Sequence, residues 1–584
     1  MMYTKNEWTT ILGIGGIILA MFLAFAVYSI YHKRKEKQRL LLRIRASWGA
    51  WPEREYEYQE LDVISGYYQN RKQDCFQIDD ITWNDLDMDR IFMLLNHTNS
   101  YMGEGYLYYL LRTPSYSEEE LQKREELIRY FQDPAHTGER EQLQVFFAKA
   151  GKSKRQPIFD TIYNLADAQS GSKAHHYLMA GLIPASVIVL LINPMSGILL
   201  LLAAMFISMM DYYKKKRPVE PYVLSCGFLL RTLETAEAME KINIPELKPY
   251  QERMHAARKT FGRLKRNTAF LIMGSRTDGD LLTAFVMYLN SCFHIDLIQF
   301  DTVVKEMKKH ISEFEILIEE IGKVESAIAI ASFRELMQNY TVPELKMAGT
   351  ENSGKQNTVP VPFLETADLY HPLIQDPVTN SISTKRGVLL TGSNASGKST
   401  FLKTVAINAL LAQSVHTCMA SSWKSSYFRV FSSMALQDNL VEQESYYIVE
   451  IKSLKRVLDR LDGKENAAPV LCFVDEVLRG TNTVERIAAS SQILKYMTGS
   501  RVICFAATHD IELTHILESS YDNYHFQEEI EENDIHFDYI LHSGRAVSRN
   551  AIKLLQIMGY EPEVIRQAEE NAEHFLESGE WEKI

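Results

Sequence analysis

Residues 387–400 read GVLLTGSNASGKST, and the helical run FLKTVAINALLAQ follows directly at 401–413. The first five residues suit a short buried strand, and the glycines at 392 and 397 let the backbone turn sharply between strand and helix. The spacing GxxxxGK[ST] gathers backbone N–H groups and the positive end of a helix around one point, which favours a bound phosphate. The stretch therefore predicts a phosphate-binding loop within a parallel α/β domain.

A hydrophobic run that ends in two acids supplies the second half of such a site. Val470 to Glu476 reads VLCFVDE, the pattern of a core strand followed by carboxylates. We expect Asp475 to hold Mg²⁺ together with Ser399, and Glu476 to orient or deprotonate the attacking water. Lys398 is expected to contact the β- and γ-phosphate oxygens of the nucleotide.

A third strand-like run, Val502 to Ala507, is followed by Thr508-His509-Asp510. A lone histidine is more often structural, but one just after a core strand is well placed to sense a γ-phosphate through its imidazole N–H. The sequence thus predicts a site for ATP and Mg²⁺ with three catalytic side chains, those of Lys398, Glu476 and His509. The expected nucleotide-binding residues of the loop are Gly392, Asn394, Ser396, Gly397, Lys398, Ser399 and Thr400. The expected metal ligands are Ser399 and Asp475.

Composition excludes several broad classes of protein. The 584 residues are 46% apolar and 24% charged, as in ordinary folded proteins, so the chain is neither disordered nor collagenous. Its 63 basic and 75 acidic residues give a net charge of −12, so any contact with nucleic acid must come from a local basic surface. The six cysteines form no CxxC pair, which argues against a zinc site and against a disulfide framework.

Residues 11–31 form an uncharged apolar segment, ILGIGGIILAMFLAFAVYSIY, long enough to cross a hydrocarbon core of about 30 Å. The alternative is a signal peptide, whose apolar core would be shorter and followed by a small-residue cleavage site. Here the basic stretch HKRKEKQRLLLRIR follows, whereas only Lys5 precedes. The positive-inside rule then predicts a retained anchor with the rest of the chain in the cytoplasm. We therefore expect a multi-pass protein of the cell (plasma) membrane, with the lipid bilayer as a partner.

A second apolar block, residues 177–210, is split into two halves by Asn193-Pro194. Basic residues flank both ends, which fits a tight helical hairpin through the membrane with both ends in the cytoplasm. The alternatives are a buried soluble hairpin and a re-entrant loop. A third apolar stretch, residues 281–299, is interrupted by polar side chains, at Asn290, His294 and Asp296. These polar residues favour a core helix over a membrane span.

Changes in composition divide the chain into segments. The expected segments are an N-terminal transmembrane anchor (1–40), a juxtamembrane linker (41–80), a first helical region (81–176), the transmembrane helical hairpin (177–210), a second helical region (211–345) and the nucleotide-binding domain (358–584). Between the last two, residues 349–357 read GTENSGKQN and form a polar linker. The basic stretch 253–266 is read as a solvated helix face, with a phosphate- or lipid-contacting surface as the alternative.

These motifs resemble those of the MutS family of mismatch-repair ATPases. The loop TGSNASGKST looks like the family's TGPNMGGKST, and DEVLRGTNT from Asp475 looks like its DEIGRGTST. Ala507-Thr508-His509 matches its ATH, and ESYYIVE around Ser445 stands where the family has STFMVE. The likeness is strongest from about residue 367 to 575. Weaker likenesses extend it at several places: Tyr370-His371-Pro372, Asn380, Asn523 with His525, Asn96–Pro114 and Val324–Ala331.

The resemblance implies a fold and a mechanism. The fold is an α/β P-loop ATPase domain of the ABC/MutS type, C-terminal to an all-α core and lever region that carries the N-terminal transmembrane helix and the inserted transmembrane hairpin. Family members dimerise through their ATPase domains, so a homodimer is implied in which Ser445 reaches the γ-phosphate bound to the other subunit. His525 would pack near the adenine. Hydrolysis would switch the dimer between states and move the helical levers.

The sequence departs from the family where DNA is read. The family's mismatch reader is an N-terminal domain with a Phe-x-Glu motif, whereas here the expected membrane anchor takes that place and no such domain fits between residues 32 and 80. The family's GRGT is LRGT, with Leu478, and the Gly-Arg before its Ser is Gln443-Glu444. The resemblance therefore supports ATP hydrolysis more than mismatch recognition.

Three functions are compatible with a nucleotide-binding core of this kind. The first is a membrane-anchored MutS-like ATPase that acts on DNA and has a role related to mismatch repair. The second is a membrane-tethered ATP-dependent switch whose partner is protein or lipid. The third is an ABC transporter, which needs an LSGGQ-like signature, and the sequence has ESYYIVE in the corresponding region.

Overall fold

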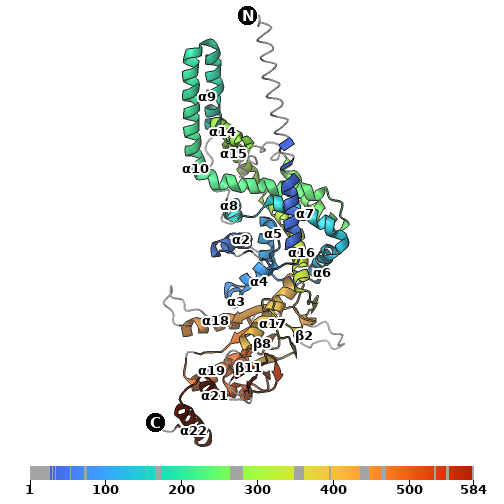
Figure 1. Ribbon diagram of the computed structural model, residues 1–584, viewed down its shortest axis with the longest axis vertical. Helices are drawn as coiled ribbons and strands as arrows, with labels where there is room; N and C mark the ends of the chain where they lie inside the picture. The colour runs from blue at the N-terminus through green and yellow to red at the C-terminus, as the bar shows by residue number, and fades with distance from the viewer. Residues whose placement is uncertain are drawn as a thin grey trace. The chain divides into compact units, whose positions relative to one another are not determined.

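The chain folds into two compact units. The computed structural model describes residues 27–581 except for 29–30, 33, 53, 55, 72–74, 154–155, 165–172, 263–280, 348–360, 394–395, 435–445, 462–467, 480, 532–533 and 547–550. The helical unit comprises Met1–Lys72, Leu95–Tyr109 and Glu126–Leu336, and the α/β unit comprises Gln73–Leu94, Leu110–Glu125 and Met337–Ile584. The predicted order of a helical N-terminal region and a mixed α/β C-terminal domain is confirmed (Figure 1).

Amphipathic patterns account for the helices of the first unit. In α16 (Ile311–Met337), for example, the buried residues Phe314, Leu317, Ile318 and Ile321 recur at helical spacing. The Glu325 carboxylate of α16 accepts the backbone N–H of Ser100 (2.9 Å) just before α5. The other helices are α2 (Tyr58–Asn70), α5 (Tyr101–Arg112), α6 (Glu118–Gln132), α7 (Thr137–Ala150), α8 (Ile158–Tyr163), α9 (Lys173–Ile192), α10 (Pro194–Glu240), α11 (Lys248–Thr260), α14 (Leu281–Phe293) and α15 (Ile295–Lys309).

Helices α9 and α10 form a long antiparallel hairpin (Figure 1). Two stretches of it, Lys173–Ile192 and Pro194–Glu220, are long and apolar enough to cross a membrane. The turn lies at the predicted break, where the Asn193 side chain accepts the N–H of Ser196 (3.4 Å). A Cβ on Gly197 would lie 2.2 Å from the Cα of Leu190, so glycine permits this close approach of the two helices. Most of the predicted segment 11–31, namely residues 11–26 and 29–30, lies outside the described residues.

The third apolar stretch is not one continuous helix of the core. Helices α14 and α15 meet at His294, whose φ of 54° lies in the left-handed region and ends the first helix. Helix α14 packs against the hairpin, where Cys292 forms a small buried cluster with Ile183 and Ala204. The single helix expected here is thus two helices, because the left-handed backbone at His294, which no pattern in the sequence indicates, separates them.

The α/β unit is organised around a six-stranded sheet with the order β12-β9-β4-β8-β7-β6. Its strands are parallel except β12, which pairs antiparallel with β9 at one edge. The strands are β4 (Gly387–Thr391), β6 (Arg429–Ser433), β7 (Val470–Asp475), β8 (Val502–Ala507), β9 (Tyr521–His525) and β12 (His542–Ser543). A smaller sheet has the order β1-β5-β2-β3, and β10 (Glu528–Glu531) pairs with β11 (Asp534–Phe537). The smaller sheet consists of β1 (Glu344–Lys346), β2 (Leu364–Leu369), β3 (Asn380–Thr384) and β5 (Ser422–Ser426).

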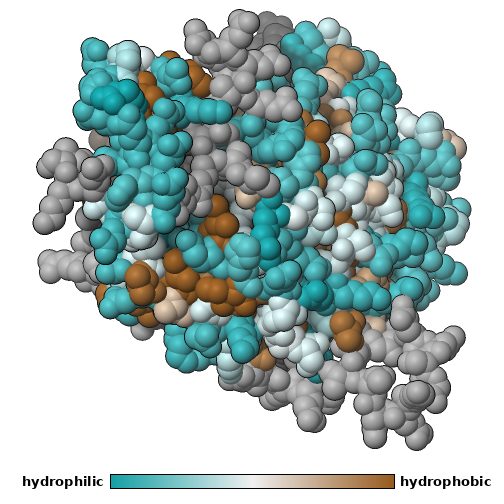
Figure 2. Space-filling model, turned by 90° about the horizontal axis from the view of Figure 1, so that it is seen from below, coloured by the Kyte–Doolittle hydropathy of each residue, from teal (hydrophilic) through white to brown (hydrophobic). Residues whose placement is uncertain are grey.

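Helices surround this sheet, and α3 (Asp80–Asp85), α17 (Lys398–Ser414) and α18 (Tyr446–Leu461) pack directly against its strands. The other helices of this unit are α4 (Met88–Leu95), α19 (Thr483–Tyr496), α20 (Ile511–Ile516), α21 (Ala551–Ile557) and α22 (Pro562–Ser578). Strands β4 and β8 are buried along their whole length, which explains their continuous apolar runs. On the face of the molecule in Figure 2, hydrophilic side chains cover most of the surface and hydrophobic ones gather in small groups.

The sheet topology brings three chain segments to one edge. Leu390 of β4 and Asp475 of β7 both lie in register with Ala507 of β8, so the carboxyl ends of these strands are adjacent. In open parallel sheets this edge is where ligands bind. The residues that follow the three strands are therefore the candidates for a functional site.

Candidate functional site

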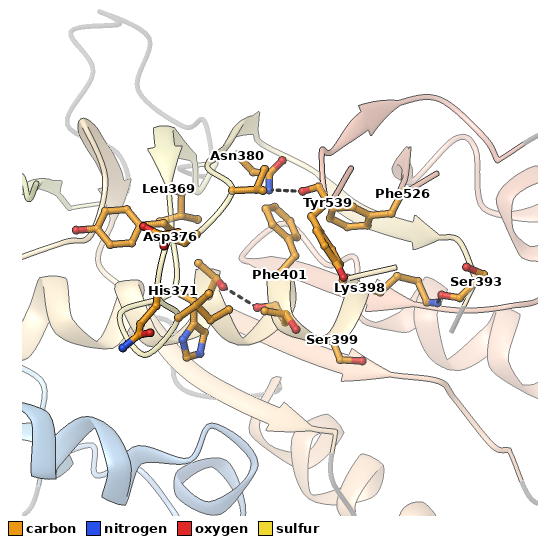
Figure 3. Close-up of a pocket in the computed structure, with 18 of the residues that line it drawn as sticks. Leu369, His371, Asp376, Asn380, Ser393, Lys398, Ser399, Phe401, Phe526 and Tyr539 are labelled. Carbon is orange, nitrogen blue, oxygen red and sulfur yellow. Dashed lines mark hydrogen bonds between the residues drawn. The ribbon is translucent and has the colours of Figure 1, made fainter. Parts of the chain in front are cut away.

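A cavity of about 730 Å³ opens at the carboxyl edge of the sheet (Figure 3). One wall comes from the glycine-rich loop, the start of α17 and the segment after β7. This wall consists of Ser393, Gly397, Lys398, Ser399, Thr400, Glu476 and Arg479. The rest of the lining includes Tyr370, His371, Ile374, Val378, Asn380, Phe401, Phe526 and Tyr539. The structure thus brings both halves of the predicted nucleotide site to the same cavity.

The loop conformation requires its two glycines. Gly392 and Gly397 have φ values of 145° and 105°, which side-chain-bearing residues rarely adopt. A Cβ on Gly392 would also lie 2.7 Å from the carbonyl oxygen of Phe526. Ser396 is buried within the loop, where its hydroxyl donates to the Ser393 carbonyl (2.9 Å). Asn394 lies outside the described residues.

Lys398 folds over the loop that a phosphate is predicted to occupy. Its ammonium donates to the carbonyl oxygens of Gly392 (2.7 Å) and Ser393 (2.6 Å). Burial lowers the pKa of this ammonium, although the nearby carboxylates Asp475 and Glu476 act in the opposite direction. A buried cation that donates to neutral carbonyls is well prepared to bind an anionic group.

Ser399 and Asp475 meet at the foot of the loop. The Ser399 hydroxyl donates to Oδ2 of Asp475 (2.5 Å), and the buried Oδ1 of this carboxylate has no hydrogen-bond partner among the described residues. Burial raises the pKa of Asp475, so an added cation would stabilise its charged form. Within the described residues no three His, Cys, Asp or Glu side chains group as a metal site. The pair nevertheless fits Mg²⁺, which takes one or two protein oxygens and completes its shell with water and substrate phosphates.

Glu476 is held between two basic side chains. His509 Nε2 lies 2.9 Å from its Oε1, and Arg479 donates to its Oε2. Partial burial favours the neutral form, but the hydrogen bonds from His509 and Arg479 prevail and lower the pKa of Glu476 to about 2. Its backbone has a φ of 55° and is fixed by an N–H bond to the Ala507 carbonyl (2.9 Å). The structure therefore joins the predicted acid and the predicted histidine in one hydrogen-bonded group.

The sequence reasoning did not find Glu450, which supports this acidic segment from α18. Its buried carboxylate accepts the backbone N–H of Leu478, a residue whose φ of 61° is unusual for a leucine. A left-handed conformation costs roughly 1–2 kcal/mol in a residue other than glycine. The resemblance has glycine at this position, and the left-handed conformation explains why glycine suits it, whereas Leu478 adopts it under strain. The only signal in the sequence was the shared glutamate of STFMVE and ESYYIVE.

Aromatic and polar residues form the outer part of the cavity. The Asn380 amide donates to the carbonyl of Tyr539 (3.0 Å) and accepts the N–H of Leu541 (2.7 Å), which fixes the turn that carries Tyr539. The Tyr539 ring then lies against the loop at Gly397, close enough that a Cβ there would be 3.3 Å from the ring (Figure 3). Burial lowers the pKa of His371 to about 4, so its ring is neutral near pH 7.

Two further predicted residues are not found at the cavity. His525 is not part of the lining; its ring Nδ1 lies 3.1 Å from the Gly544 carbonyl, and the ring is 5.5 Å from that of His542. Ser445 lies outside the described residues, directly before α18. The roles of His525 and Ser445 stay predictions, and Tyr539 is the ring that the structure places over the loop.

Comparison with known proteins finds sequences similar to this domain. The MutS domain V model matches residues 388–576. Among similar curated proteins, MutS protein homolog 4 of Homo sapiens is 27% identical over 222 residues, 34% of this chain and 23% of that protein. The DNA mismatch repair protein MutS of Thermotoga maritima is 31% identical over 225 residues, which cover 37% and 26%. That of Thermotoga neapolitana is 26% identical over 292 residues, which cover 49% and 30%.

The matches begin at β4 and include the loop, the acidic segment and His509. The chain spans about a quarter of the length of the first two of these relatives. Residues 388–576 therefore form a domain that matches MutS domain V, and over about a third to a half of its length the chain is similar to MutS proteins.

Proposed function

We propose that this protein is a membrane-tethered MutS-type ATPase that binds and hydrolyses ATP with Mg²⁺. The observation that carries the proposal is that Lys398, Ser399 and Glu476 line one cavity, with Asp475 bonded to Ser399 and His509 bonded to Glu476 from behind. These groups provide a phosphate cation, a metal position and an ionised carboxylate, which are the recurring parts of P-loop hydrolysis sites. The P-loop arrangement of β4, loop and α17 is part of this proposal.

The contacts of these residues indicate which of them binds phosphate, which holds the metal and which acts on the attacking water. The loop N–H groups and Lys398 bind the phosphates, and Lys398 exchanges its carbonyl partners for phosphate oxygens. Ser399 and Asp475 hold Mg²⁺, which neutralises charge on the phosphates. Glu476, already ionised, orients the attacking water and accepts its proton, while His509 holds this carboxylate and faces the γ-phosphate.

A shared site between two copies of the chain would couple hydrolysis to movement. By the resemblance, Ser445 reaches the nucleotide of the partner subunit, and α18 begins at the next residue. Glu450 on α18 contacts the backbone beside Glu476 through Leu478. A homodimer therefore has a contiguous path from the partner's γ-phosphate to the catalytic acid, which favours a switch between two dimer states.

The hairpin supports a membrane location. Its side chains leave large apolar surfaces uncovered, with exposed fractions of 82% for Leu191, 75% for Leu199 and 67% for Phe206. Patches of this kind on a soluble surface would cause aggregation, whereas a bilayer would cover them. With residues 1–40 as an anchor, the flanking basic residues would place the ATPase domain in the cytoplasm at the plasma membrane.

The relatives named as DNA mismatch repair proteins favour a DNA-directed role for the switch. The net charge of −12 favours the alternative, a switch that acts on a protein or lipid partner without DNA. Both roles use the same ATP site. They differ in the partner that alters the rate of ATP turnover: DNA in the first, a protein or lipid in the second.

ATP turnover of the full-length protein in nanodiscs tests both parts of the proposal. We expect Mg²⁺-dependent turnover that duplex DNA stimulates, with a stimulation that falls steeply as salt rises. A larger stimulation by mismatched than by matched duplex would indicate mismatch recognition. Turnover indifferent to every DNA would select the switch without DNA, and absence of turnover with Mg²⁺ and ATP would refute the ATPase.

A further inference from the structure

Helix α14 buries polar residues together with Val286 and Cys292, and its described outer face is apolar. Ala284, Phe285, Met287 and Tyr288 are exposed, and the exposed fractions of Phe285 and Met287 are 58% and 52%. Asn290 and Ser291 on the same helix are only 2% exposed. A helix on a water-facing surface shows the opposite arrangement, with its apolar face against the core. The described part of α14 therefore has the polarity of a helix in an apolar solvent.

His294, one of the polar residues that interrupt this stretch, is hydrogen-bonded to the hairpin. The Nδ1 atoms of His294 and His176 are 3.0 Å apart, and His294 Nε2 lies 3.1 Å from the Ser208 carbonyl. The hydroxyl of Ser208 donates in turn to the Cys292 carbonyl (2.7 Å). Polar groups that contact one another inside a helix bundle, and not its outer surface, are typical of membrane proteins.

A second set of contacts fixes the depth at which α15 begins relative to the membrane surface. Asp296, at the start of α15, accepts the hydroxyl of Tyr212 (2.7 Å) and lies 3.4 Å from the Lys216 ammonium. Lys216 belongs to the basic group KKKR at 214–217, which the positive-inside rule places at the cytoplasmic surface. The junction between α14 and α15 thus lies just inside that surface, at the level of Ser208 to Tyr212.

From this junction α14 runs along the apolar part of the hairpin. Its Cys292 and Phe293 pack with Ile183, Ala204 and neighbouring hairpin side chains. Figure 1 shows α14 beside α9 and α10, near the end of the hairpin away from its turn. Its 13 residues measure about 20 Å at 1.5 Å per residue, too short for a hydrocarbon core of about 30 Å.

We propose that the outer face of α14 contacts lipid, so that the helix enters the bilayer beside the hairpin without crossing it. The inference rests on the proposed membrane location of the hairpin and adds a third, partly inserted element to it. Lipid is the favoured occupant because this face continues the uncovered apolar surface of the helices against which α14 packs. Tyr288 on this face also suits the interface between headgroups and acyl chains.

Spin labels at single cysteines distinguish lipid from water and from protein. Cys75 is exposed and the other cysteines are buried, so Cys75→Ser gives the background chain. Labels are placed by Phe285→Cys and Met287→Cys on α14. Leu199→Cys on the hairpin serves as the lipid reference and Lys241→Cys, just after α10, as the water reference. The full chain is studied in nanodiscs of phosphatidylcholine and phosphatidylglycerol, and its ATP turnover checks that each variant is folded.

Collisions with oxygen report lipid, and collisions with a water-soluble nickel chelate report water. We expect the ratio of oxygen to nickel accessibility at 285 and 287 to exceed one, as at 199, and to fall below one at 241. A ratio below one at 285 and 287 with a lipid-like value at 199 would overturn the proposal for α14 alone. Low accessibility to both reagents would also overturn it and indicate a protein partner. A water-like value at 199 would refute the membrane location of the hairpin itself.

Discussion

Strand β4, its loop and α17 bury apolar side chains and direct Lys398 and Ser399 into a cavity. Helix α14 and the hairpin instead bury Asn290 and His294 and leave Phe285 and Leu199 uncovered. The first region suits a fold surrounded by water, whereas the second suits a fold surrounded by lipid. In both regions the side chains that the surrounding solvent disfavours are the ones that are buried. The experiments below test one region or the other.

Among the variants that leave the phosphate loop intact, the largest effect is expected at the acid of the cavity. Glu476→Gln removes the ionised carboxylate that orients the attacking water, so turnover should fall by about 10²–10⁴-fold. ATP affinity should be retained, because the loop and Lys398 are untouched. Steady-state turnover and equilibrium nucleotide binding measure the two quantities. The control is Glu485→Gln, a nearby acid at the start of α19, and normal turnover in Glu476→Gln would remove its catalytic role.

A smaller loss of turnover is expected when Glu450, which holds the backbone beside Glu476, is removed. Glu450→Ala removes a buried charged hydrogen bond, typically about 1.5–3 kcal/mol, so we expect turnover to fall by about 10–100-fold. Leu478→Gly relieves the left-handed backbone and should restore part of the loss in the double variant. Asp459→Ala, on the exposed side of the same helix, is the control. A double variant no better than Glu450→Ala would contradict the positioning role.

In the hairpin, Gly197 should contribute far more to stability than Gly181. Gly197→Leu would force a side chain into the Leu190 backbone, whereas a Cβ on Gly181 meets nothing within 4 Å. We expect Gly197→Leu to destabilise the hairpin by about 1–3 kcal/mol and Gly181→Leu to leave it unchanged. Thermal unfolding in detergent compares the two. Equal melting temperatures would show that the close approach at the turn is not important for stability.

The smallest expected effect is a shift of pH dependence. Hydrogen bonds from His509 and Arg479 hold the pKa of Glu476 at about 2, so this group stays ionised throughout the usual assay range. As a base it loses activity only when pH falls through its pKa. Arg479→Ala removes one donor and its charge, so the acid limb of turnover should move upward by roughly one unit or more. Arg566→Ala on α22 is the control, and an unmoved limb would contradict the assigned contact.

The sequence predicted those features whose residues are neighbours in the chain. The loop, the Asp475-Glu476 pair and the hairpin turn at Asn193-Pro194 each depend on a short contiguous pattern, and the structure brings the first two to one cavity. Features that depend on distant partners were missed. Glu450 acts on Leu478, which lies 28 positions away, and His294 meets His176 from 118 positions away. The spacing of polar residues could not reveal that they face inward.

His525 illustrates the same limit within the domain that resembles the family. The pattern N-x-H placed a histidine at the end of β9, but the direction of its ring depends on β12 and the Gly544 carbonyl. Tyr539 came to the cavity because Asn380, 159 positions earlier, fixes its turn. Contacts between segments distant in the sequence, and not the N-x-H motif itself, therefore decide which ring lies at the cavity.

The most direct test of the central claim is a comparison of two lysines on α17. Lys398→Ala removes the cation that donates to the loop carbonyls, and Lys403→Ala removes one that pairs with Asp87. In nanodiscs with Mg²⁺ and ATP, we predict that Lys398→Ala abolishes turnover and that Lys403→Ala retains it. Wild-type turnover in Lys398→Ala would contradict the assignment of this cavity as the ATP site.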